Sequence, residues 1–223
     1  MVEAPAATAA LRVEELGLLP YEEALAIQRD RVERRIAGTI PDTLLFVEHP
    51  PVFTLGRNGR AENLLVPRAA LGGLGIAYHA SDRGGDITYH GPGQIVGYPI
   101  IDLRAHRQDL RWYVCSLERV LIETLERFGI SGGRCDGERG VWIGDRKIAA
   151  LGIHVSRWVT SHGFALNAVN DLTPFRYIVP CGIAGKGVTS MAELAGPVDI
   201  ASVKAALLEG LARVFELAPE NAA

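Results

Sequence analysis

The sequence predicts a mixed α/β (α+β) fold, in which helices pack on a mixed, largely antiparallel sheet. Two observations lead to this fold class. Segments with apolar residues at helical spacing are interspersed with many short, hairpin-like strands, and the regular strand–helix alternation of a parallel sheet is missing. A length of 223 residues, without internal repeats or a low-complexity linker, indicates one domain spanning residues 1–223.

The first half of the chain is expected to contain one helix and several short strands. The helix spans residues 19–36, because Pro20 stands near its start and glutamates follow in the first turn. Its apolar face is expected to carry Leu25, Gln28, Val32 and Ile36. Strands are expected over residues 43–49, 52–56, 76–81, 87–90 and 94–103, and a short helix ended by glycines over residues 67–75.

The second half contains the clearest helix, over residues 109–130. One face of that helix is apolar and comprises Leu110, Tyr113, Val114, Leu117, Val120, Leu121, Leu125 and Phe128. A hairpin over residues 141–155 and a strand over residues 162–170 follow. Asp199 is the expected N-cap of a last helix that ends at residue 215, and residues 217–223 are expected to fray.

The hairpin has a natural two-residue turn at residues 144–145. With that turn, Trp142 pairs with Lys147 across the two strands. Alternation along the second strand then places Ala149 and Leu151 on the same face of the sheet as Lys147.

Composition excludes several classes of protein. The net charge of −3 gives no basic surplus for binding nucleic acid or an anionic membrane as the main task. No apolar run has the length of a membrane span, and the first residues lack the pattern of a signal peptide. Three unpaired cysteines without metal-ligand spacing indicate a reducing compartment, expected to be the cytoplasm, and no metal site.

The three cysteines differ in their surroundings. Cys115 lies beside the apolar stripe of a helix, which favours a packing role. Cys135 lies in a polar turn with nothing nearby to activate it. Cys181 stands between Pro180 and Gly182, in a loop that allows close approach to a ligand, and is the candidate for chemistry.

A nucleophilic cysteine needs a base or a cation to form its thiolate. Only three of the 23 basic residues are lysines, and two of them are candidates: Lys186, close to Cys181 in sequence, and Lys147, on a mainly apolar strand. The rival bases are His49, His90 and His154, and the spacing of the lysines and histidines does not show which of them lies near Cys181.

The densest group of glycines and polar residues lies between residues 81 and 99. Backbone amides in such loops can bind a carbonyl oxygen, and we expect this of residues 84–93. The segment lacks the spacing of a phosphate-binding loop, and a tight hairpin is its simplest structural role.

Four blocks together resemble the lipoyl(octanoyl) transferases, the lipoate-protein ligase B family. They are "RGGDITYHGPGQIVGYP", "GDRKIAALGIHV", "HGFALNAVNDL" and "VPCGIAGKGVTSM", which occur in the order of the family and lie between residues 83 and 191. The resemblance implies the fold of the biotin- and lipoate-ligase catalytic domain, with a tunnel for an acyl chain.

The reaction implied by the resemblance moves an octanoyl group from acyl carrier protein to a lysine of an apo lipoyl domain. The acceptors would be the lipoyl domains of 2-oxoacid dehydrogenases and the glycine-cleavage H protein. The resemblance assigns the acylated cysteine to Cys181 and its partner to Lys147, with no cofactor or metal, in a protein expected to be monomeric. The implied substrate-binding residues are Arg83, Gly84, Gly85, Asp86, Ile87, Thr88, Tyr89, His90, Ala150, Leu151, Gly152, Gly163, Phe164 and Ala165.

Three other functions remain open at this point. An ATP-dependent lipoate ligase of the same fold would bind an adenylate and form no acyl-cysteine. A non-catalytic module would dock lipoyl domains or hold a fatty acid. A cysteine hydrolase using His90 or His154 would release free octanoate.

Overall fold

The computed structural model describes residues 9–179 and 186–221. Two sheets organise them. The larger sheet has the order β12-β1-β2-β6-β10-β9-β8-β7, with β11 beside β9, and the smaller has the order β4-β3-β5. The strands of the larger sheet are β1 (Ala9–Leu18), β2 (Asp42–Glu48), β6 (Gln94–Ile100), β7 (Gly133–Cys135), β8 (Glu138–Ile143), β9 (Arg146–Ser156), β10 (Val159–Asn167), β11 (Gly187–Val188) and β12 (Leu217–Asn221). Those of the smaller sheet are β3 (Val52–Leu55), β4 (Ala77–Ala80) and β5 (Ile87–His90).

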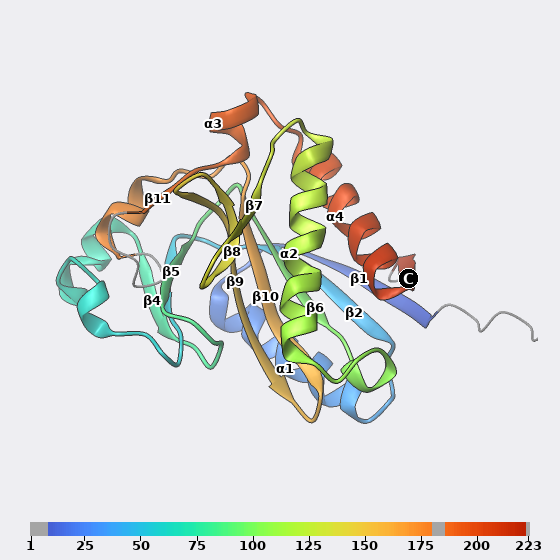
Figure 1. The fold of residues 1–223 in the computed structure, drawn as a ribbon. Helices are drawn as coiled ribbons and strands as arrows, with labels where there is room; N and C mark the ends of the chain where they lie inside the picture. The colour runs from blue at the N-terminus through green and yellow to red at the C-terminus, as the bar shows by residue number, and fades with distance from the viewer. Residues whose placement is uncertain (1–8, 180–185, 222–223) are drawn as a thin grey trace, which may run out of the picture.

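The central strands pair antiparallel, whereas β1 pairs parallel with both β2 and β12. The expected mixed, largely antiparallel sheet with packing helices is therefore confirmed. The smaller sheet lies beside β11 and contributes a second, separate apolar cluster (Figure 1).

Helices cover both faces of the larger sheet. They are α1 (Tyr21–Ile36), α2 (Leu110–Arg127), α3 (Met191–Ala195) and α4 (Ile200–Phe215). Helices α2 and α4 pack together on one face and enclose the main core, and α1 covers β6 and β10 on the other face (Figure 1). Short 3₁₀ turns occupy Ala61–Asn63, Arg68–Ala70, Gly72–Leu74, Leu103–Ala105 and Thr173–Tyr177.

Local capping fixes the starts of α2 and α4. The Asp109 carboxylate accepts from the amide of Trp112, and that of Asp199 accepts from the amide of Ser202. The expected N-cap at Asp199 is thus confirmed. Leu110 was expected on the buried face of α2, but it lies in the first turn, beyond the core, and is 45% exposed.

The buried face of α1 differs from the expected one. The residues turned inward are Tyr21, Ala24 and Gln28, whereas Leu25 is only half-buried. The amide oxygen of Gln28 accepts from the backbone N–H of His162, at 2.8 Å, where β10 adopts a positive φ. A buried polar contact with β10, together with the packing of Ala24 and Ile27 on an apolar cluster, therefore accompanies the observed rotation of α1.

Both ends of the described chain differ from expectation. The segment expected to fray contains β12, and no strand was expected where β1 forms. Ala9 pairs with Leu217 and Val13 with Asn221, and the buried Leu217 belongs to the main core. Residues 67–75, expected to form one short helix, form two consecutive 3₁₀ turns instead. Gly75, in the left-handed region, ends the second turn.

The hairpin formed by β8 and β9 has the expected pairing of Trp142 with Lys147. One further expectation about it is wrong. Val141 pairs with Ala149, so β9 carries one extra residue, Ile148, between these two pairs. The bulge reverses the alternation beyond it. Ala149 therefore faces the main core and Lys147 lines the cavity described below, whereas Leu151 packs against the core and also borders that cavity.

Candidate active site

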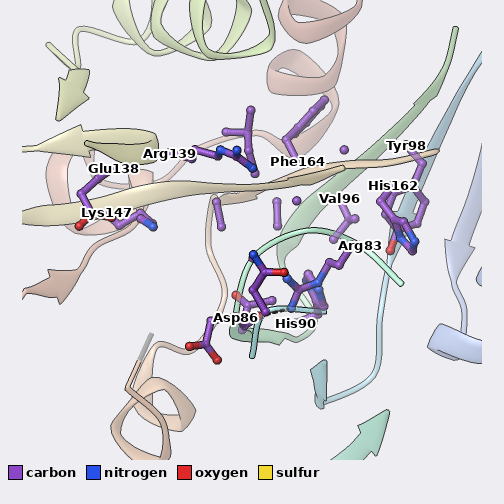
Figure 2. Close-up of a pocket in the computed structure, with 18 of the residues that line it drawn as sticks. Arg83, Asp86, His90, Val96, Tyr98, Glu138, Arg139, Lys147, His162 and Phe164 are labelled. Carbon is purple, nitrogen blue, oxygen red and sulfur yellow. Dashed lines mark hydrogen bonds between the residues drawn. The ribbon is translucent and has the colours of Figure 1, made fainter. Parts of the chain in front are cut away.

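An open cavity of about 270 Å³ lies where the two sheets meet. Strands β6, β9 and β10 form its floor, to which β9 and β10 contribute small residues, and its other side is formed by β5 and the glycine-rich loop before β5 (Figure 2). Most of the site residues predicted from the sequence line this cavity. They are Arg83, Gly85, Asp86, Thr88, His90, Lys147, Ala150, Leu151, Gly152, Gly163, Phe164 and Ala165. Tertiary structure thus brings three separate sequence blocks to one place.

Three residues of the expected substrate-binding set lie elsewhere. Gly84 lines an adjoining cavity. Ile87 and Tyr89 are buried in the apolar cluster on the far side of the smaller sheet. Because side chains alternate along β5, Thr88 and His90 face the cavity and their neighbours face away from it.

Lys147 lies at one end of the cavity and is only 6% exposed. Its Nζ is 4.6 Å from the centre of the Trp142 ring, its cross-strand partner. Lys186 Nζ is 4.7 Å from the centre of the same ring and donates to Cys135 Sγ at 3.0 Å, a contact that raises the pKa of Lys186. Of these two lysines, therefore, it is Lys147 that lines the cavity.

Arg83 holds the glycine-rich loop in shape. Its buried guanidinium donates to the carbonyl oxygens of Thr54 at 2.6 Å, Gly84 at 3.1 Å and Asp86 at 2.8 Å. A planar guanidinium can satisfy several converging carbonyl groups at once. Arg83 therefore both lines the cavity and fixes the backbone around it.

Several amides of the glycine-rich segment are already engaged within the protein. The N–H of Gly84 donates to the carbonyl oxygen of Ile153 at 2.8 Å, and that of Gly93 donates to a Glu48 carboxylate oxygen at 2.8 Å. The N–H of Ile87 donates to an Asp86 carboxylate oxygen at 2.6 Å. Any stabilisation of an oxyanion by this loop must therefore come from its remaining amides.

His90 is buried in a polar network at the wall of the cavity. Burial holds its pKa well below the ordinary value, so the ring is neutral. Its Nδ1 lies 2.7 Å from Gln94 Oε1, while the amide nitrogen of Gln94 donates to Asn167 Oδ1 at 2.9 Å. The Gln94 oxygen can only accept, which assigns the proton to Nδ1. The basic Nε2 faces Thr54 Oγ1 at 3.5 Å.

A second cavity, of about 770 Å³, adjoins the first and shares Asn58, Gly137, Glu138 and Arg139 with it. His154 lines this second cavity, and its Nδ1 accepts from Arg57 Nη2 at 2.8 Å. Two of the cysteines, Cys115 and Cys135, also line it; the first is half-buried in α2 and the second lies in β7 rather than in a turn. The rival bases His90 and His154 therefore line different cavities.

Sequence reasoning missed the residues at the end of the first cavity opposite Lys147. Tyr21, Val96, Tyr98 and His162 line this region. Val96 and Tyr98 fall inside a block recognised in the sequence, and strand alternation places them on one face of β6. Tyr21, from α1, had no signal in the sequence, because only the packing of that helix brings it to the cavity.

Cys181, the expected nucleophile, lies outside the described residues. The described chain on either side of residues 180–185 reaches Lys147. Phe175 precedes these residues and Val188 follows them, and both line a small cavity together with Lys147 and Ala150. Val188 also pairs with Lys147 in the parallel contact of β11 with β9.

Residues 9–179 and 186–221 contain no cluster of three or more His, Cys, Asp or Glu side chains that could hold a metal ion. Within the same residues, no helix combines the length and the apolar character needed to cross a membrane.

Solved structures show the same fold. A lipoate-protein ligase A bound with ATP superposes with a TM-score of 0.77 at 16% identity, covering 96% of this chain and 90% of that one. A bi-partite lipoate protein ligase from Thermoplasma acidophilum gives 0.73 at 16% identity, covering 96% and 87%. A biotin protein ligase from Aquifex aeolicus gives 0.52 at 14% identity, covering 91% and 69%.

Sequence comparison is more specific. The model of the lipoyl protein ligase A/B catalytic domain matches residues 20–212. An octanoyltransferase from Solibacter usitatus is 52% identical over 91% of both chains. An octanoyltransferase from Gloeobacter violaceus is 51% identical over 90% of this chain and 88% of its own. The chain therefore belongs to the lipoyl protein ligase A/B catalytic-domain family, and within that family to the octanoyltransferases.

Proposed function

We propose that this protein transfers an octanoyl group from octanoyl-acyl carrier protein, through a thioester on Cys181, to the target lysine of apo lipoyl domains. The acceptors are the lipoyl domains of 2-oxoacid dehydrogenases and the glycine-cleavage H protein, and the reaction takes place in the cytoplasm. The names of relatives about half identical in sequence support the activity. Residues 1–223 form the catalytic domain, which acts without a cofactor.

The observation that carries the proposed mechanism is the position of Lys147. It is nearly buried at one end of an acyl-sized cavity, and it pairs with Val188, which follows Cys181 by seven positions. Phe175, which precedes Cys181 by six positions, lines a small cavity with the same lysine. Both flanks of the segment containing Cys181 therefore meet at Lys147, which supports the pairing of the two residues.

The chemistry proceeds in two steps. The Cys181 thiolate attacks the octanoyl carbonyl carbon, a new S–C bond forms, and the carrier thiolate leaves and takes up a proton. The amine of the lipoyl-domain lysine then attacks the same carbon, the S–C bond to Cys181 breaks, and an amide results. The first step exchanges one thioester for another and is nearly balanced, whereas amide formation makes the second step favourable.

Lys147 serves the proton transfers in both steps. As an ammonium it stabilises the Cys181 thiolate, and as a neutral amine it takes the proton of the thiol or of the incoming lysine. Two such neighbouring groups titrate as a unit. The Trp142 ring, 4.6 Å from Nζ, limits where the amine can point.

The cavity floor accommodates the acyl chain because its residues are small. Ala150, Gly152, Gly163 and Ala165 line it on β9 and β10. Burial of the chain contributes about 0.8 kcal/mol per methylene, which amounts to several kcal/mol for an octanoyl group. At Gly152 a methyl group would lie 2.9 Å from the Gly84 carbonyl oxygen, so the close packing of the glycine-rich loop also requires glycine at this position.

The decisive experiment is intact-mass measurement after incubation with octanoyl-acyl carrier protein. We expect one octanoyl group on the wild-type protein, and its transfer to apo lipoyl domain when that domain is added. Cys181→Ala should abolish both signals, while Cys115→Ser, the matched control, should keep them. Wild-type transfer by Cys181→Ala would overturn the proposed intermediate.

Lys147→Arg tests the second residue of the pair. Arginine keeps the positive charge but does not lose its proton at working pH, and its planar guanidinium differs in shape from the compact ammonium of lysine. We expect transfer to fall by about 10²-fold or more, measured as octanoylated lipoyl domain per unit time. Lys204→Arg, on α4 and ion-paired with Glu15, is the control. Equal rates of acyl transfer in Lys147→Arg and Lys204→Arg would contradict a role of Lys147 in proton transfer and show that its role is structural.

The same assays separate the three other functions. ATP-dependent loading of free lipoate would indicate a ligase, and the appearance of free octanoate would indicate a hydrolase. Tight binding of lipoyl domain without transfer would indicate a non-catalytic module.

A further inference from the structure

The end of the cavity opposite Lys147 is closed by ring side chains from three different elements. Tyr21 comes from α1, Tyr98 from β6 and His162 from β10. Figure 2 shows Tyr98 and His162 at one end of the lining and Lys147 at the other. All three rings are nearly fully buried, so protein atoms stand behind them rather than solvent. We call Tyr21, Tyr98 and His162 the end wall.

Tyr98 is held in place by a buried histidine. The Tyr98 hydroxyl lies 2.8 Å from His49 Nε2, and His49 Nδ1 lies 2.7 Å from the carbonyl oxygen of Leu19. Burial lowers the pKa of His49 to about 4, so the ring is neutral and carries one proton. The Leu19 oxygen can only accept, so that proton is on Nδ1, and Nε2 accepts from the tyrosine. The hydroxyl is thereby tied away from the cavity.

The other two members of the end wall are tethered in the same manner. The His162 Nε2–H donates to Asp82 Oδ1 at 2.8 Å, and the Tyr21 hydroxyl lies 2.7 Å from Ser81 Oγ. The Tyr98 and His162 rings meet edge to face, with centroids 6.1 Å apart. Each ring can therefore present carbon atoms to the cavity while its polar atoms are bonded elsewhere.

We infer that this tethered end wall, and Tyr98 in particular, sets the length of the acyl chain that the protein accepts. The inference rests on the proposed function, which places the reacting carbonyl at the Lys147 end. With that end fixed, the terminal methyl group of the chain meets the end wall. A wall whose rings cannot rotate rejects longer chains by steric overlap and leaves a gap behind shorter ones. His49 is a positioning residue that acts through Tyr98.

The test compares hexanoyl, octanoyl, decanoyl and dodecanoyl carrier proteins as donors, with kcat/KM measured for each. Wild type should prefer octanoyl. Tyr98→Ala opens the wall, and we expect the ratio of dodecanoyl to octanoyl kcat/KM to rise by about tenfold or more. Tyr113→Phe removes a buried tyrosine hydroxyl on the opposite face of the sheet and is the matched control. It should keep the wild-type preference.

Variants that keep the ring test the tether itself. His49→Leu removes the acceptor for the Tyr98 hydroxyl, and we expect it to broaden chain-length preference without losing transfer of octanoyl groups. His49→Gln keeps a side-chain carbonyl and should restore part of the selectivity. Thermal denaturation shows which variants are folded, and Tyr98→Leu replaces the alanine variant if that protein is unstable.

Two results would have different meanings. An unchanged chain-length profile in folded Tyr98 variants that still transfer octanoyl groups would overturn the inference and leave the proposed function intact. Failure of wild type to transfer any acyl group from any of the four donors would overturn the proposed function itself.

Discussion

At the scale of single residues, the most unusual feature is the enclosure of three neutral histidines around one end of the cavity. Burial lowers the pKa of His49 to about 4, and it also lowers the pKa values of His90 and His162. The rings of His49 and His90 lie 5.6 Å apart, and each also contacts Tyr21. Protonating one ring therefore introduces a charge into a site that cannot solvate it.

We predict that acid destabilises the protein well above the pKa range of carboxylates. The unfolded chain takes up a proton at His49 near pH 6.5, whereas the folded chain does so only near pH 4. The contribution of neutral His49 to the free energy of unfolding is therefore complete above pH 6.5 and is lost as the pH decreases toward 4. His49 alone accounts for roughly 3 kcal/mol of this loss. Urea denaturation at several pH values measures it.

His49→Gln should reduce the slope of stability against pH, because a non-titrating residue replaces the ring. His79→Gln, which removes a half-buried histidine at the edge of the smaller sheet, serves as the control. A free energy of unfolding that stays constant between pH 7 and 4.5 in wild type would contradict this prediction.

Sequence motifs identified most, but not all, of the residues that line the cavity. Arg83, His90 and Lys147 lie within recognisable blocks and do line it. Tyr21 was missed because its block carries no chemical signature, and Ile87 was assigned to the cavity although it points away. A motif identifies a stretch of chain, whereas the direction of each side chain depends on packing.

At the scale of elements, the bulge in β9 decides which residues accompany Lys147. With regular alternation, Lys147 and Ala149 would lie on the same face of the sheet. The bulge instead leaves Ala149 in the main core and places Ala150 on the side of Lys147. Gly140, opposite on β8, has a φ of 114°, and a methyl group there would lie 2.5 Å from the Ala149 carbonyl oxygen.

We predict that Gly140→Ala lowers both stability and acyl transfer. The added methyl group must push β9 away at the bulge, which should cost about 1–3 kcal/mol beyond the strain of the positive φ. Gly129→Ala is the matched control, since Gly129 also has a positive φ, nothing lies within 4 Å of the added carbon, and it does not line the cavity. Urea denaturation and the transfer assay measure the difference, and equal losses in the two variants would refute the role of the close contact.

At the scale of the whole molecule, the two ends of the described chain complete the larger sheet together. Strand β12 pairs with β1, which in turn pairs with β2 (Figure 1). Leu217 is buried in the main core beside residues of α4. Removing β12 would expose the edge of β1 as well as this apolar site.

We predict that a protein ending at Glu216 is less stable than one ending at Asn221. Loss of Leu217 burial alone costs about 1.5–3 kcal/mol, and each kcal/mol lowers Tm by about 2–4 °C at this size. We therefore expect a decrease of at least 3 °C, together with a greater tendency to aggregate. Calorimetry measures the first and light scattering the second. Indistinguishable Tm values would show that β12 contributes nothing to the folded state.

The sequence by itself determined the fold class, the N-cap of α4, the pairing of Trp142 with Lys147 and the blocks that identify the family. These features depend on local spacing, turn chemistry and motif residues, all of which are readable over short stretches of chain. Tertiary structure alone decided the side of β9 on which Ala149 lies, the rotation of α1, the end wall and the pairing of β1 with β12. Each of these depends on contacts between residues distant in sequence, whose energies no local pattern encodes.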